Sequence, residues 1–193
     1  MATEYKYPGL HQEKSAPTKL EITVSCKNLP KMDNLSESDP KVFLFLEKKE
    51  FNNVNVNSIW SRIDSTETIN NNPNPVFQKS FFIDYYFETI QKLRFMVVDM
   101  DDKSEEWIKN DFIGYVEVSI ADLIHKSKDN VFTADLLTNV PDGMEVNNVK
   151  ARAVLDTSKI FIRVEEVEKV THTLNIDITG TNLDKKKRYT YIK

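Results

Sequence analysis

The chain contains eight short strand-like segments separated by loops rich in Asn, Asp, Pro and Ser. Leu20 to Cys26 and Ile160 to Val167 alternate apolar and polar residues, which is the period of a strand with one buried face. Val42 to Leu46 and Leu93 to Val98 are almost continuously apolar, as in strands that are buried on both faces. The remaining strand-like segments are 58–68, Val76 to Ile83, Phe112 to Val118 and Val131 to Leu137. This pattern predicts an all-β antiparallel sandwich or barrel.

Only one segment has a helical pattern, from Ser119 to His125, and Ser119 is suited to cap its first turn. We therefore expect an eight-stranded antiparallel β-sandwich in which the last strand, 160–167, completes a sheet.

Composition excludes several classes of protein. The 193 residues have a formal net charge of −4 and no basic run, so we expect no nucleic-acid partner. No stretch approaches the roughly 20 apolar residues of a membrane span, and the polar segment from Met1 to Thr18 does not resemble a signal peptide. Cys26 continues the apolar row of the first strand, which indicates a buried thiol. Because it is the single cysteine, the chain cannot form an internal disulfide, and we expect a reducing, cytosolic compartment.

Three loops stand out by their composition. Residues 28–40 and 99–111 are long and acidic, and residues 69–75 are rich in Asn and Pro. Because alternate loops of a sandwich meet at one end, these three loops, which follow the first, third and fifth strands, are predicted to share an apex. Long loops in a compact domain are usually functional.

The acidic loops bring five carboxylates toward that apex. They belong to Asp33, Asp39, Asp99, Asp101 and Asp111. Two such charges about 4 Å apart repel by about 4 kcal/mol at an effective dielectric constant of about 20, so a clustered set favours a bound cation. Oxygen ligands without histidine or thiolate favour calcium over zinc. The alternative for each single residue is that it only forms a turn, since Asp bonds readily to nearby backbone.

These loops resemble those of C2 domains. Asp33 followed by Ser38-Asp39-Pro40 is similar to the first calcium loop of that family, and Asn74-Pro75-Val76-Phe77 to the turn after its second loop. Asp99-Met100-Asp101 and Asp111-Phe112-Ile113-Gly114 are similar to its third calcium loop. The resemblance covers residues 19–167. It implies that the five aspartates hold calcium between the first and third loops.

A narrower resemblance is to the first C2 domain of copines, in the run from Phe82 to Glu88 followed by Gln91 to Phe95. Copines continue into a second C2 domain and a von Willebrand A-like domain, and they bind phospholipid when calcium rises. Residues 174–183 repeat the pattern of residues 20–29, as the opening of a second C2 domain would. We therefore expect a tail at 1–18, a C2 domain at 19–168 and the start of a truncated second C2 domain, or an extension, at 169–193.

Apolar residues in the acidic loops are candidates for membrane contact. Trp107 and Ile108 lie in the extended third loop, and Leu35 lies in the first. Tryptophan favours the membrane interface because its ring is apolar and its N–H is polar. The alternative is that Trp107 packs onto the rim of the sandwich.

The expected function is a calcium-dependent module that binds anionic phospholipid such as phosphatidylserine, with other proteins as further partners. We expect it in the cytoplasm, recruited to the plasma membrane or other membranes when calcium rises. Neither a nucleophile–base pair nor a phosphate-binding loop is evident in the sequence, so we do not expect an enzyme. The alternative is a calcium-independent protein-interaction C2 module. A strand at 160–167, with none evident in 1–18, favours the permuted (type II) C2 topology.

Overall fold

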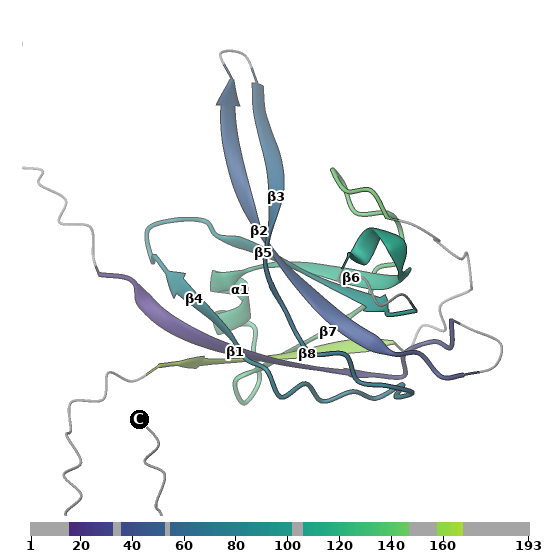
Figure 1. Cartoon of the computed structure of the whole chain (residues 1–193). Coiled ribbons are helices and arrows are strands. Elements are labelled where there is room, and N and C mark those ends of the chain that lie inside the picture. Colours follow the sequence, from purple (N-terminus) through teal and green to yellow (C-terminus); the bar gives the residue numbers. More distant parts are fainter. Residues whose placement is uncertain (1–15, 33–35, 53–54, 102–105, 147–157, 168–193) are drawn as a thin grey trace, which may run out of the picture.

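In a computed structural model of the chain, the described residues are 16–32, 36–52, 55–101, 106–146 and 158–167. They form eight strands, one α-helix and one 3₁₀ turn (Figure 1). The elements in chain order are β1 (Thr18–Lys27), β2 (Pro40–Asn52), β3 (Asn55–Ser65), β4 (Phe81–Tyr85), β5 (Lys92–Asp99), η1 (Trp107–Lys109), β6 (Asp111–Ser119), α1 (Ile120–His125), β7 (Val131–Asp135) and β8 (Lys159–Glu166).

The strands pair into two four-stranded antiparallel sheets, which confirms the predicted all-β sandwich. The first sheet has the order β4-β1-β8-β7 and the second has the order β3-β2-β5-β6. The last strand, β8, lies at the centre of the first sheet and pairs with β1 along its whole length. This position fits a permuted C2 arrangement, although the assignment to that topology stays a prediction.

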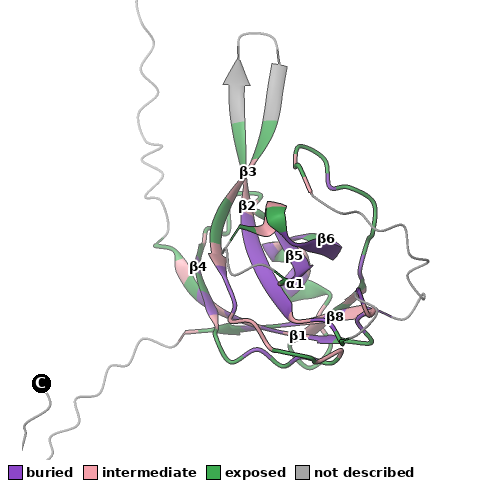
Figure 2. Cartoon of the chain, turned by 45° about the vertical axis from the view of Figure 1, so that its right-hand side comes forward, coloured by how far each residue is buried: buried purple, intermediate pink, exposed green. Residues whose placement is uncertain are grey.

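The core lies between the two sheets. Leu20, Ile22, Val24 and Cys26 of β1 alternate inward, as their period-two pattern predicts, and all are buried. Figure 2 shows that the buried ribbon at the centre of the molecule belongs mainly to β2, β5 and β6 of the opposite sheet. Burial of apolar side chains throughout this core is the dominant favourable contribution to folding.

The second sheet is buried on both faces, as its continuous apolar runs predict. On its outer face, Phe43, Phe45, Met96, Val98, Phe112 and Tyr115 form a second apolar cluster. Partly buried side chains pack over this cluster, among them Trp60, Met100, Trp107, Met144 and Val146. The segment after β7 and the third loop therefore cover a face that would otherwise be exposed.

The strand predicted from Val76 to Ile83 begins later, at Phe81. Val76 forms only an isolated bridge with Ser25, and then the chain leaves β1. The reason is the carboxylate of Glu67, which accepts hydrogen bonds from the backbone N–H of Gln78 at 2.5 Å and of Lys79 at 3.2 Å. These donors are therefore unavailable to β1.

The predicted helix is confirmed. The N–H of Asp122 donates to the Ser119 hydroxyl at 3.0 Å, so Ser119 caps the first turn of α1.

Beyond Leu46, β2 leaves β5 and pairs with β3 alone among the described strands, so the two form an arm (Figure 1). Lys48 and Lys49 are exposed on this arm, as a solvated surface requires.

Candidate functional site

The three loops singled out in the sequence meet at one end of the sandwich. The N–H of Leu29 in the first loop donates to the carbonyl of Pro73 in the second at 2.9 Å. The N–H of Met100 in the third loop donates to the carbonyl of Asp39 in the first at 3.0 Å. We call this end the apex. Figure 1 shows it on the right, where β1 ends and β2 begins.

The first loop is tied down next to its acidic residues by Ser38, which is only 2% exposed. Its hydroxyl donates to the carbonyl of Pro30 at 2.9 Å and accepts from the N–H of Met32 at 3.2 Å. Pro40 then opens β2. The Ser-Asp-Pro motif thus holds Asp39 at the start of a buried strand.

Three of the five predicted acidic residues lie side by side at the ends of neighbouring strands. Asp99 ends β5 and pairs in register with Pro40 on one side and with Asp111 on the other. Asp39 immediately precedes Pro40, and its N–H donates to Oδ1 of Asp99 at 2.5 Å. Paired residues in antiparallel strands have Cα atoms about 4.5–5.5 Å apart, so these three residues form one short row.

Burial and exposure differ along this row. Asp99 and Asp111 are each 2% exposed, whereas Asp39 is half-buried. Asp101, two residues beyond Asp99, is exposed. The carboxylate of Asp39 accepts from the N–H of Asn71 at 2.6 Å, which links the second loop to the row. Asp33 lies outside the described residues.

The residue types at the apex suit calcium, because carboxylate oxygens are the ligands that a hard divalent cation prefers. Among the described residues, however, no group of three or more His, Cys, Asp or Glu side chains is arranged to hold a metal ion. Two of the carboxylates, those of Asp39 and Asp99, accept backbone hydrogen bonds instead. The apex therefore fits a calcium site in its chemistry and backbone placement, and the ligand geometry itself is not formed by these side chains.

Trp107 lies in η1, within the third loop, and is half-buried. Its ring meets the ring of Phe45 edge-on, with centroids 5.2 Å apart, and that of Phe43 at 6.1 Å. Its indole N–H is buried and has no hydrogen-bond partner among the described residues. This is the packing that the sequence left open as the alternative to membrane insertion. A membrane role for Trp107 stays a prediction.

The other two candidates for membrane contact differ in what can be said of them. Ile108 follows Trp107 in η1 and is half-buried. The turn is held by Asn110, whose N–H donates to the carbonyl of Trp107 at 3.1 Å and whose side chain donates to that of Glu106 at 2.7 Å. Leu35 lies outside the described residues.

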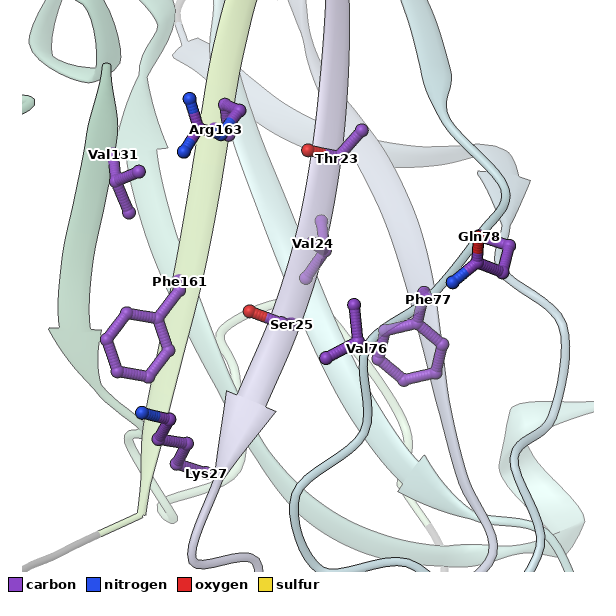
Figure 3. Close-up of a pocket in the computed structure, with 10 residues that line it drawn as sticks. All are labelled: Thr23, Val24, Ser25, Lys27, Val76, Phe77, Gln78, Val131, Phe161 and Arg163. Atoms are coloured by element: carbon purple, nitrogen blue, oxygen red, sulfur yellow. The ribbon is translucent and has the colours of Figure 1, made fainter. Parts of the chain in front are cut away.

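A hollow that sequence reasoning missed lies on the outer face of the first sheet (Figure 3). It has a volume of about 480 Å³, and it opens where the chain after Val76 leaves β1. Its lining includes the cations Lys27 and Arg163 but no carboxylate, and the Lys27 ammonium lies 5.4 Å from the centre of the Phe161 ring. This hollow is therefore not a second calcium site. No signal in the sequence marks it, because it depends on the path of residues 76–80.

Among the described residues, no helix is long and apolar enough to cross a membrane.

Comparison with known proteins gives a consistent picture. The sequence profile of the C2 domain matches residues 18–134. Copine-E of Dictyostelium discoideum is 37% identical over 169 residues, which cover 88% of this chain and 26% of that protein. Copine-B of the same organism is 33% identical over 175 residues, covering 89% of this chain and 29% of that protein. The chain thus spans about a quarter of the length of these relatives.

Among solved structures, human GIVD cytosolic phospholipase A2, in complex with an inhibitor and terbium chloride, aligns with a TM-score of 0.50. It is 17% identical, and the alignment covers 81% of this chain and 18% of that protein. At this identity the match supports the fold alone.

Proposed function

This chain belongs to the C2 domain family, and on that premise we propose that it is a calcium-dependent phospholipid-binding module. C2 domains bind membrane lipids or proteins. Membership of this family therefore supports a role in binding rather than in catalysis. The finer proposal is that its apex recruits it from the cytoplasm to anionic membranes, such as those that contain phosphatidylserine. The main supporting observation is the row of Asp39, Asp99 and Asp111 on three neighbouring strand ends.

The proposed ligands are the carboxylates of the first and third loops. These are Asp33, Asp39, Asp99, Asp101 and Asp111. Calcium, when bound, supplies positive charge at the apex and coordination positions for headgroup oxygens. To serve as ligands, the carboxylates of Asp39 and Asp99 would have to give up the backbone hydrogen bonds that they accept from Asp39 and Asn71.

The charge of the apex determines the direction of the switch. Without a cation, the acidic row repels an anionic surface, and the field of that surface falls off within about 8–10 Å at physiological salt. Neutralising the row removes this repulsion, while the sheets behind it need not move. Because the net charge of the whole chain is only −4, the effect depends on this local cluster.

Apolar contact adds to the electrostatic attraction. We propose Ile108 and Leu35 as side chains that enter the interface, together with the accessible part of Trp107. Ile108 is half-buried on the same loop as Asp101 and Asp111, so it would lie close to a bilayer that the apex approaches.

Sedimentation with vesicles tests the proposal. The full chain should pellet with phosphatidylserine vesicles to a greater extent in calcium than after chelation, and this calcium-dependent part of the pelleting reports on the apex. Replacing Asp33 and Asp99 by Asn keeps an oxygen acceptor at each position but removes two charges, so it should abolish the calcium-dependent pelleting. Asp84→Asn, an exposed carboxylate on β4, is the matched control and should behave as the unmodified chain.

The protein-interaction module is the competing proposal. It predicts pelleting that is unchanged by calcium, chelator or the paired Asn substitutions. That result would count against the calcium switch.

A further inference from the structure

The end of the sandwich away from the apex presents apolar side chains to solvent. Phe87 is 80% exposed and Ile90 is 75% exposed, both in the turn that joins β4 to β5. The turn lies on the left in Figure 1, whereas the apex lies on the right. Between them runs β5, whose eight residues span about 25 Å at about 3.3 Å per residue. None of the functions derived above uses this turn.

Hydrogen bonds brace the turn in the shape that exposes these side chains. The side chain of Gln91 connects the two ends of the turn. Its Oε1 accepts from the N–H of Tyr86 at 2.8 Å, and its Nε2 donates to the carbonyl of Asp84 at 2.9 Å. The N–H of Thr89 donates to the carbonyl of Tyr86 at 3.0 Å. The carbonyl of Gln91 accepts from the N–H of Ile120, the first residue of α1, at 2.9 Å. The exposure therefore belongs to an ordered turn.

This bracing also lowers the cost of placing the turn in an apolar environment. An unpaired backbone group costs several kcal/mol in hydrocarbon, so a segment that enters a bilayer must pair its own polar groups. The N–H groups of Tyr86 and Thr89 and the carbonyls of Asp84, Tyr86 and Gln91 have partners within the protein. Among the described residues, the N–H groups of Phe87, Glu88 and Ile90 have none, so the insertion is confined to the interface, where water can pair them. The two most exposed side chains, at positions 87 and 90, carry no polar atom.

Size and charge favour lipid over a protein partner. Phe87 and Ile90 together expose roughly 300 Å², and the neighbouring Phe82 and Tyr86, which are 57% and 40% exposed, raise the apolar surface to roughly 500 Å². A stable protein interface needs about 800 Å² from each partner. The exposed charged residues around the turn are Lys19, Asp84, Glu88 and Lys92. They are two of each sign, so the turn requires no anionic headgroup.

We propose that the β4–β5 turn is a second lipid contact, at which Phe87 and Ile90 insert into a bilayer without calcium. Because the turn and the apex lie at opposite ends, one bilayer cannot meet both ends of an upright molecule. If the proposed function of the apex holds, the chain would bridge two membranes when calcium is present. The insertion itself does not depend on that function.

An environment-sensitive fluorophore tests the insertion. The native Cys26 is 1% exposed, and burial raises the pKa of its thiol to about 12, so a cysteine introduced by Phe87→Cys takes the label selectively. With phosphatidylcholine vesicles and chelator, emission from position 87 should shift to shorter wavelength. Val140→Cys, an exposed apolar position outside the turn, is the matched control and should show no shift. No shift at position 87, or an equal shift at both positions, would overturn the proposal.

Vesicle clustering, followed by light scattering in calcium, tests the bridging. Phe87→Ser with Ile90→Ser should abolish clustering of phosphatidylserine vesicles but leave calcium-dependent pelleting intact. Both residues are exposed, so the melting temperature should be unchanged. Equal clustering by this variant would contradict the bridge. If the unmodified chain shows the fluorescence shift at position 87 but no calcium-dependent pelleting, the proposed function of the apex is wrong and the insertion of the turn still holds.

Discussion

Trp107 is a residue for which the sequence allows two interpretations, insertion into a membrane or packing onto the sandwich. An aromatic residue in an acidic loop predicts membrane insertion, but its ring lies against Phe43 and Phe45 on the outer face of the second sheet. The apolar character of that face is evident from the sequence, as Val42 to Leu46 is apolar throughout. Which loop covers it depends on the tertiary fold, so the sequence leaves the choice open.

The packing predicts the effect of removing the ring. Trp107→Ala should lower the free energy of unfolding by about 1–3 kcal/mol, less than for a fully buried aromatic residue because the side chain is half-exposed. Trp107→Phe should recover part of this loss, since a phenyl ring can keep the edge-on contact with Phe45. Chemical denaturation measures both values. An unchanged unfolding free energy for Trp107→Ala would show that the ring contributes nothing to the fold.

The effect on lipid binding can be separated from this loss of stability. Ile108→Ser should weaken calcium-dependent pelleting with little change in unfolding free energy, whereas Trp107→Ala changes both. If Trp107→Ala alters stability alone, Trp107 is a packing residue and the membrane contact rests on its neighbours.

At the scale of elements, the strand pattern could be predicted from the sequence almost completely. A periodic or continuous apolar pattern falls within each of the eight strands, because most of them have at least one buried face, and the Ser119 cap locates α1. Two features escape such prediction. The arm of β2 and β3 extends past Leu46 through mostly polar and charged residues, in which Phe51, Val56 and Ile59 form no regular alternation, and the late start of β4 depends on a single distant carboxylate.

That carboxylate, Glu67, has a testable role. Partial burial pushes its pKa upward, but the N–H groups of Gln78 and Lys79 and the Lys79 ammonium outweigh burial, so the pKa lies below its usual value. A depressed pKa in the folded state contributes stability above the unfolded pKa, and this contribution is lost as pH falls through the folded pKa. Glu67→Gln should therefore cost about 1 kcal/mol at neutral pH.

The pH dependence distinguishes this account from a general packing effect. The difference in melting temperature between the unmodified chain and Glu67→Gln should be largest near pH 7 and should shrink toward zero as the pH falls below about 4. A difference that stays constant from pH 7 to pH 3 would mean that the charge of Glu67 is not what holds residues 78 and 79.

At the scale of the whole molecule, the acidic apex and the apolar turn lie at opposite ends of one sandwich. The sequence predicts the shared apex because loops after alternate strands meet, and the hydrogen bonds among the three loops confirm it. It could not predict that Asp39 and Asp99 bond to backbone, since those contacts depend on loop geometry. The turn also escaped prediction, because isolated apolar residues in a loop are common and only the structure reveals their exposure.

The domain organisation expected from the sequence stays a prediction. The described strand β1 begins at residue 18, where the family match also begins, and β8 ends at residue 166, two residues before the expected boundary. The repeat at 174–183 lies outside the described residues. Because the chain spans about a quarter of its copine relatives, activities of a whole copine are not transferred to it.

Calorimetric titration of the full chain with calcium, with and without phosphatidylserine vesicles, tests the central claim most directly. The proposed apex predicts saturable binding in solution and tighter binding with vesicles, because lipid and calcium must raise each other's affinity by the same factor. Asp33→Asn with Asp99→Asn should remove the heat in both cases. The absence of saturable binding up to millimolar calcium, with vesicles present, would contradict the calcium switch.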